Sequence, residues 1–343
     1  MKHQTVKLHR CGFEEQIIAL IEESRHKVVS AVNMAMVYTY FEVGRRIVDE
    51  EQNGNDHAGY GDRLIEKLAK TLTAKFGRGY SAQNLRNMRQ FYLIYAKSQK
   101  CQTLSGKFKF TLSWSHYLLL MRMEPMARQF YEIEACENGW SVRELERQYN
   151  ASLYERLALS RSKQKVLELS TKGQIVEKPE DALKDPYVLE FTGLPELPSY
   201  TESQLEQKLI DHLQDFLLEM GKGFAFVGRQ VRITDKEDHY YIDLVFYNRL
   251  LRCFVLVDLK RGKLRHQDIG QMQMYVNYYD RKVKLDEENP TIGILLCADK
   301  SDFVVKYSLP EENNQIFARQ YKTVLPSKAA LKRLVQAQIG VCH

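Results

Sequence analysis

The sequence predicts two domains, an all-helical N-terminal domain followed by an α/β domain whose central sheet is flanked by helices. At 343 residues the chain exceeds one typical hydrophobic core, and its 44% hydrophobic and 27% charged residues are typical of soluble globular proteins. Apolar residues recur every three or four positions from residue 14 to about residue 160. After about residue 200, strand-like runs alternate with helical ones.

The boundary between the two domains is expected between residues 160 and 200. A polar stretch over 160–173 interrupts the helical periodicity, and four prolines follow it at positions 179, 186, 195 and 198. We therefore assign residues 1–160 to the helical domain, 161–200 to a linker and 201–343 to the α/β domain.

Two consecutive helices of the first domain resemble a helix-turn-helix. Residues 64–76 predict a helix that ends at Gly77, and Ser81 is the expected N-cap of the next helix. In that second helix Leu85, Met88, Tyr92 and Tyr95 turn inward, while polar side chains of types that pair with base edges turn outward. The candidate nucleic-acid-binding residues are Arg78, Gln83, Arg86, Asn87, Arg89 and Gln90. A purely structural or dimer-forming helix is the alternative.

The net charge of +6 is unevenly distributed along the chain. From Lys67 to Met123 there is no acidic residue, and the same segment contains eleven basic ones. These are Lys67, Lys70, Lys75, Arg78, Arg86, Arg89, Lys97, Lys100, Lys107, Lys109 and Arg122. A basic run of this length favours a polyanionic partner such as a nucleic acid.

The second domain is expected to contain a helix, three strands, a second helix and further strands. The first helix spans about 202–220, and the strand-like runs are 224–233, 240–247 and 252–260. A helix over 266–279, strands over 291–297 and 315–321, and a C-terminal helix over 328–338 complete the predicted order.

Two acids and a lysine lie in strands whose pattern predicts burial. The run 253–260 is apolar on both faces until its end, which is typical of a central strand, and Asp258 and Lys260 share one face of it. Asp243 is the single acid of the preceding apolar run. Unpaired charges at such positions would cost several kcal/mol, so these three groups require one another or a metal ion.

The helix before the sheet adds a fourth charged group. At 100° per residue, Glu206 falls inside the apolar stripe that contains Leu205 and Leu209, so it should face the sheet. Glu202 lies on the same side, but in the first turn, where solvent and the helix dipole can satisfy it.

The order of an acid on a helix, an acid on a strand and acid-x-Lys on the next strand resembles the PD-(D/E)XK nuclease superfamily. Six segments more narrowly resemble its YhcG family, over nearly the whole chain. They are 76–81 (FGRGYS), 84–92 (NLRNMRQFY), 112–117 (LSWSHY), 223–230 (GFAFVGRQ), 241–247 (YIDLVFY) and 270–275 (GQMQMY). The resemblance implies a restriction-endonuclease-like α/β domain with a mixed central sheet.

The resemblance also implies a DNA-cleaving hydrolase that uses Mg²⁺ or Mn²⁺. Asp243, Asp258 and the carbonyl of Leu259 would hold the metal, Glu206 would order water and Lys260 would orient it. Gln271 on the following helix is a candidate supporting residue. Cleavage of both strands with one site per chain would favour a homodimer.

One departure from the family pattern concerns the metal site. The family usually has Glu-x-Lys, whereas this chain has Asp258-Leu259-Lys260, and a side chain shorter by one methylene can shift a bound metal. A nuclease fold that only binds DNA or serves assembly is therefore the alternative function. The tripeptide alone is weak evidence, since Glu206-Gln207-Lys208 matches it too. The choice between DNA and RNA remains open.

Other classes of site are disfavoured by the same sequence. The six cysteines are widely spaced, without a C-x-x-C pair or a neighbouring histidine cluster, so neither a zinc site nor a disulfide framework is indicated. No apolar stretch has the pattern of a signal peptide or a membrane span. We expect a cytoplasmic protein that does not cross a membrane.

Overall fold

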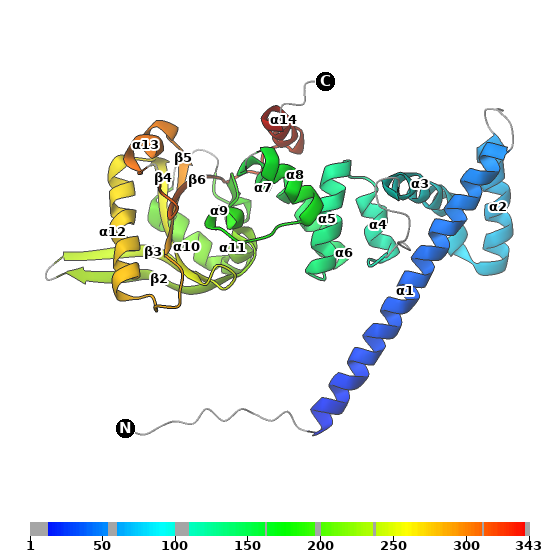
Figure 1. Cartoon of the computed structure of the whole chain (residues 1–343), viewed down its shortest axis with the longest axis horizontal. Coiled ribbons are helices and arrows are strands. Elements are labelled where there is room, and N and C mark those ends of the chain that lie inside the picture. Colours follow the sequence, from blue (N-terminus) through cyan, green and yellow to red (C-terminus); the bar gives the residue numbers. More distant parts are fainter. Residues whose placement is uncertain are drawn as a thin grey trace. The chain divides into compact units, whose positions relative to one another are not determined.

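A computed structural model gives the structure and describes residues 13–53, 60–99, 110–161, 163–195, 200–235, 238–310 and 312–339. The chain forms two compact units, Met1–Glu146 and Arg147–His343 (Figure 1). The structure differs from the predicted linker over 161–200. That segment carries α8 (Lys163–Lys172), α9 (Pro179–Ala182), β1 (Tyr187–Val188) and η2 (Glu190–Thr192) within the second unit.

The first unit is all-helical, as the sequence predicts. Its elements are α1 (Phe13–Asn53), α2 (Tyr60–Phe76), η1 (Arg78–Tyr80), α3 (Ala82–Gln99), α4 (Trp114–Leu120), α5 (Pro125–Glu137) and α6 (Val142–Asn150), the last of which crosses the boundary. Both predicted signals between α2 and α3 are confirmed. Gly77 ends α2 with a φ of 89°, and the Asn84 N–H donates to Ser81 Oγ at 3.3 Å.

Aromatic side chains and one close helix crossing hold the first unit together. Phe41, Phe91 and Tyr117 are buried, and the rings of Phe91 and Tyr117 lie 5.0 Å apart. Where α1 crosses α3, a Cβ on Gly44 would lie 2.1 Å from the carbonyl oxygen of Met88. Only glycine permits this approach.

The second unit is built on a mixed six-stranded sheet with the order β1-β6-β5-β4-β3-β2. Besides β1, its strands are β2 (Phe224–Asp235), β3 (Asp238–Asn248), β4 (Cys253–Lys263), β5 (Ile292–Asp299) and β6 (Ile316–Lys322). The strands β2, β3 and β4 pair antiparallel, whereas β4, β5, β6 and β1 pair parallel. The predicted mixed sheet is confirmed.

Helices cover both faces of this sheet and create two cores. On one face Leu205 of α10 (Glu202–Asp211) and Phe216 of α11 (Leu213–Met220) pack against Val257. On the other face, α12 (His266–Lys282) packs its apolar side, including Met272, against Leu256. The remaining helices are α7 (Leu153–Leu159), α13 (Asp302–Ser308) and α14 (Lys328–Ile339).

Two details of the second unit differ from the predicted elements. The helix expected over 202–220 is divided at His212, whose φ and ψ of −116° and 37° are not helical. The helix α13 was not predicted. Among the described residues, no helix combines the length and apolar character required to cross a membrane.

A two-stranded arm extends from the sheet. The β2–β3 pairing continues to Asp235 and Asp238, but the pairing of β3 with β4 begins only at Leu244. The strands therefore continue beyond β4 as a hairpin, which Figure 1 shows reaching past the rest of the sheet. Asp243 lies where this arm leaves the sheet.

Candidate active site

The register of the sheet brings Asp243 and Asp258 together. Leu244 pairs with Val257, so Asp243 of β3 lies opposite Asp258 of β4, and paired residues point to the same face. The Leu259 N–H donates to Asp243 Oδ2 at 2.8 Å, which fixes the first carboxylate. Asp258 is only 2% exposed.

Lys260 supplies the positive charge next to this acid pair. Its Nζ lies 2.7 Å from Asp258 Oδ2 and 3.9 Å from Glu202 Oε2. The shorter contact is an ion pair without good hydrogen-bond geometry. Among the described residues, Asp258 Oδ2 thus has no hydrogen-bond partner although it is buried. The ion pair with Lys260 therefore provides the main compensation for burying this oxygen.

The titration behaviour of these groups has clear physical causes. Burial, and then the negative charge of Asp243, raise the pKa of Asp258 to about 7, and Lys260 only partly offsets this. Burial opposes the charge on Lys260, but Asp258, Glu202 and Asp243 outweigh it and raise the pKa of the lysine. The site therefore contains more negative charge than its single ammonium balances.

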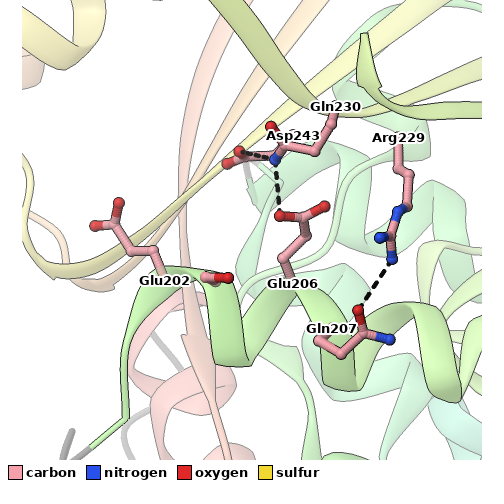
Figure 2. Close-up of a pocket in the computed structure, with 7 residues that line it drawn as sticks. Glu202, Glu206, Gln207, Arg229, Gln230 and Asp243 are labelled. Carbon is pink, nitrogen blue, oxygen red and sulfur yellow. Dashed lines mark hydrogen bonds between the residues drawn. The ribbon is translucent and has the colours of Figure 1, made fainter.

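Glu206 joins the site through a residue that the sequence did not single out. The amide of Gln230 donates to Glu206 Oε2 at 2.7 Å and to Asp243 Oδ1 at 3.1 Å (Figure 2). Glu206 faces the sheet as predicted, and its pKa is raised by burial and by the charge of Asp243. Gln230 has a φ of 47°, a left-handed conformation that is uncommon for glutamine and turns its amide between the two acids.

A shallow pocket opens beside the acids. It has a volume of about 370 Å³, and Figure 2 shows its lining residues projecting from α10, β2 and β3. They include Glu202, Glu206, Gln207, Arg229, Gln230 and Asp243. Arg229 donates to Gln207 at 3.1 Å and supplies a cation at the rim. Asp243 is the member of the acid pair that lines this pocket.

The other predicted residues of the second unit lie differently. Gln271 on α12 donates to the hydroxyl of Tyr275 at 2.5 Å, and that hydroxyl donates to the carbonyl of Tyr241 at 2.9 Å. Gln271 therefore contacts Tyr275. Burial raises the pKa of that hydroxyl, and Tyr275 lies close enough to the acid pair for the charges of Asp258 and Asp243 to raise it further. Leu259 takes part through its backbone, while its side chain is buried in the core beneath α10.

The predicted nucleic-acid-binding residues lie on η1 and α3 of the first unit. Arg78, Gln83 and Gln90 are exposed, whereas Arg86, Asn87 and Arg89 are partly exposed. Gln83 donates to Asn87 at 3.3 Å. The guanidinium of Arg89 is paired with Glu51 of α1 at 2.7 Å, so an intramolecular carboxylate balances its charge.

The basic segment is only partly described. Lys67, Lys70 and Lys75 of α2 are exposed, as is Arg78. Lys100, Lys107 and Lys109 lie outside the described residues, and the side chain of Lys97 does too. The exposed charge that the structure does describe therefore lies mainly on α2.

The acid pair fits a hard divalent cation such as Mg²⁺. Among the described residues, no group of three or more His, Cys, Asp or Glu side chains converges on one point. Mg²⁺ does not require such a cage, because it usually keeps several waters and binds one or two carboxylates together with substrate phosphate oxygens. The two neighbouring carboxylates, where burial and mutual repulsion raise the pKa of Asp258, suit such an ion.

Gln230 and Glu202 are the site residues that sequence reasoning missed or ranked too low. Gln230 has no acidic or basic character, and its signal in the sequence is its place at the end of the family-like segment 223–230 (GFAFVGRQ). The register of β2 with β3 then places it opposite Asp243. The sequence predicts that solvent satisfies Glu202, yet its carboxylate accepts from the Arg261 N–H at 3.2 Å and lies near Lys260.

Two family models and a named relative together match most of this chain. The family described as "YhcG PDDEXK nuclease domain" matches residues 180–336, and "DUF1016 N-terminal domain" matches residues 16–156. The protein named "Putative nuclease YhcG" of Escherichia coli (strain K12) is 41% identical over 349 residues, covering 94% of this chain and 92% of that protein.

Two solved structures also match part of the chain. A repair endonuclease from Pyrococcus abyssi gives a TM-score of 0.25 at 17% identity and covers 38% of this chain and 50% of that one. EndoMS in its apo form gives a TM-score of 0.25 at 16% identity, with 38% and 48% covered. The matched region spans about half the length of these two chains.

Proposed function

The chain belongs to the YhcG family of PDDEXK nucleases, and from this premise we propose that it is a Mg²⁺-dependent endonuclease that hydrolyses phosphodiester bonds of DNA. The observation that carries the proposal is the paired carboxylates of Asp243 and Asp258, with a lysine ammonium 2.7 Å from the second. A structural ion-pair network would be expected to balance its charges. This site places two facing carboxylates, Asp243 and Asp258, against one ammonium.

The residues of the chain would divide the chemistry among them. Asp243 and Asp258, with the carbonyl of Leu259, would hold Mg²⁺, which when bound stabilises charge on the phosphate and lowers the pKa of its water. Lys260, anchored by Asp258, would orient the attacking water and offset charge near the scissile phosphate. Glu206 would order water on the pocket side of Asp243.

The geometry also supports a positioning role for hydrogen bonds around Asp243. Its two carboxylate oxygens accept from different strands, one from the Leu259 N–H on β4 and one from Gln230 on β2. Two bonds of this kind fix both the position and the rotation of the carboxylate. Preorganisation of a charged group lowers the cost of reaching the transition state.

We propose DNA as the substrate and the first unit as an additional DNA-binding domain. The support is the acid-free segment from Lys67 to Met123 and the exposed lysines of α2 within it. Arg78, Gln83, Arg86, Asn87, Arg89 and Gln90 remain the proposed contacts on η1 and α3. We expect the pairing of Arg89 with Glu51 to weaken its contribution relative to the lysines of α2.

Asp243→Asn tests the nuclease itself. The substitution keeps the size of the side chain and removes its charge, so metal-dependent cleavage should be lost while DNA binding persists. Asp215→Asn on α11, an exposed acid outside the acid pair, is the matched control and should cleave normally. Supercoiled, linear, single-stranded and branched DNA should be assayed with Mg²⁺ and with Mn²⁺. Binding without cleavage of any of these substrates would favour the alternative, a catalytically inactive DNA-binding or assembly protein.

The salt dependence of DNA affinity tests the first unit. For each phosphate that a variant no longer neutralises, the slope of log affinity against log salt should fall by about 0.9. The double variant Lys67→Gln/Lys70→Gln examines α2, and Arg86→Gln/Arg89→Gln examines α3. We expect the first pair to reduce the slope more. Unchanged slopes in both would exclude these helices as phosphate-binding surfaces.

A further inference from the structure

The β2–β3 arm begins at the site's own acid, Asp243. The alternation of side chains along β3 shifts at Asp243, because Ile242 belongs to the core beneath α12 whereas Leu244 belongs to the core beneath α10. Farther along the arm, Tyr241 and His239 share a face. The register places Arg232 opposite Tyr241 and Thr234 opposite His239, on that same face. The opposite face, with Ile233 and Ile242, is buried in the core beneath α12.

The contacts on the arm agree with this assignment of faces. Arg232 Nε donates to Thr234 Oγ1 at 3.0 Å, and the Arg232 guanidinium lies 2.9 Å from His239 Nε2. At the base of the arm Gln230 reaches Asp243. The outward face formed by Tyr241, Arg232, Thr234 and His239 therefore begins next to the pocket of Figure 2, at Gln230 and Asp243.

The chemistry of this face suits a nucleic acid strand. Tyr241 is 45% exposed, which is high for an aromatic ring located two residues from a catalytic acid, about 7 Å along the strand. Arg232 is exposed directly opposite Tyr241, and Arg229 is exposed at the base of the arm, where it lines the pocket, so both can approach phosphates. Exposed aromatic rings interleaved with cations are the common means of binding single strands, because every base has a face that can stack.

Unpaired bases fit this surface better than a closed duplex does. In a duplex, neighbouring bases cover each other's faces, so a tyrosine on the surface of an arm can meet only the backbone or the groove edges. An unpaired base can leave the stack and lie on the ring. The other face of the arm, with Ile233 and Ile242, is buried in the core beneath α12. The arm can therefore contact DNA with only one polar face, whereas a strand ribbon inserted into a groove has DNA on both sides.

We propose that the outward face of the β2–β3 arm binds an unpaired segment of DNA next to the scissile phosphate, with one base stacked on Tyr241 and phosphates on Arg232. The inference rests on the proposed nuclease function, which it deepens by naming the substrate class. It predicts that DNA with single-stranded regions, such as flaps, gaps or forks, binds this surface in preference to uniform duplex.

The test measures binding by the full chain in EDTA, so that cleavage plays no part. The probes are a single-stranded oligonucleotide containing 2-aminopurine and the same sequence as a duplex. Fluorescence anisotropy gives affinity, and quenching of 2-aminopurine reports stacking directly. The variants are Tyr241→Ala and Tyr241→Phe, with Tyr278→Ala on α12 as the control because Tyr278 is exposed to a similar extent, at 38%.

We expect Tyr241→Ala to weaken single-strand binding about 10-fold and to abolish the quenching, because the ring on which the base stacks is removed. Tyr241→Phe should retain both, and Tyr278→Ala should match the unmodified chain. Duplex affinity should be the same in all four proteins. Circular dichroism should show that each variant remains folded, as expected for exposed side chains.

Three results would overturn the inference. The first is quenching that persists in Tyr241→Ala. The second is an equal loss of single-strand and duplex affinity in that variant, which would indicate that the arm inserts into a groove. The third is failure of the unmodified chain to bind single strands. None of these outcomes depends on catalysis. A chain that cleaves DNA but shows any of them retains the proposed function without the proposed surface. A chain that quenches 2-aminopurine but never cleaves DNA would retain the proposed surface without the proposed function.

Discussion

Replacing Lys260 with methionine should separate catalysis from metal binding. Methionine keeps the apolar stem of lysine and removes the ammonium, which lies 2.7 Å from Asp258 Oδ2. At an effective dielectric constant of 20, two unit charges at that distance attract with roughly 6 kcal/mol before the cost of burial is subtracted. The group is therefore a strong local source of positive charge.

The expected loss of catalysis is large, and the expected change in metal affinity is not. A charged group positioned for the transition state contributes about 3–4 kcal/mol, so the cleavage rate should fall roughly 100-fold to 1000-fold. The same ammonium repels a divalent cation at Asp258, so Mn²⁺ should bind the variant at least as tightly as it binds the unmodified chain. Protonation of Asp258, whose pKa is already raised to about 7, limits the destabilisation of the metal-free variant.

The assays are plasmid nicking with Mg²⁺ and calorimetric titration with Mn²⁺. Lys208→Met is the matched control, because Lys208 belongs to the chain's other acid-x-Lys tripeptide and is exposed on α10. It should cleave at the normal rate. The reasoning would be refuted by a Lys260→Met variant that cleaves within about threefold of the unmodified chain, well short of the loss expected from a transition-state group. It would equally be refuted by a folded variant that no longer binds Mn²⁺.

Three other substitutions probe the remaining structure. Gln230→Ala should slow cleavage about 10-fold to 100-fold, because Glu206 and Asp243 lose the amide that positions them, and should leave the melting temperature unchanged. Cleavage at the rate of the unmodified chain would show that Gln230 does not belong to the site. Burial lowers the pKa of Lys184 from 10.5 in the unfolded chain to about 8 in the folded one. The contribution of the neutral lysine to folding stability is therefore fully present above pH 10.5 and is lost as the pH falls through 8. Between pH 8 and pH 10.5, urea unfolding should therefore show up to about 3 kcal/mol more gain in stability for the unmodified chain than for Lys184→Met. The same pH dependence in both proteins would contradict the argument. Gly44→Ala forces a Cβ against the Met88 carbonyl and should cost about 1–3 kcal/mol in thermal unfolding, whereas Gly79→Ala, with open space around its Cβ, should cost far less.

The sequence alone determined the features that depend on local periodicity. Alternation along the strands placed Asp258 and Lys260 on one face, and helical spacing turned Glu206 toward the sheet. The same local rules located the end of α2 at Gly77 and the cap of α3 at Ser81. Propensity and burial pattern act over a few residues, so they can be read directly from the chain.

Only the tertiary structure decided which groups the charged residues meet. Gln230 joins an acid 24 residues away, and Arg89 pairs with a glutamate 38 residues away, so neither partner can be found by spacing. The segment over 161–200, whose prolines predict a linker, forms short elements within the second unit, and its β1 pairs with the distant β6. Such contacts are set by strand register, helix crossings and the left-handed turn at Gln230. Each of these arises only when segments far apart in sequence pack against one another.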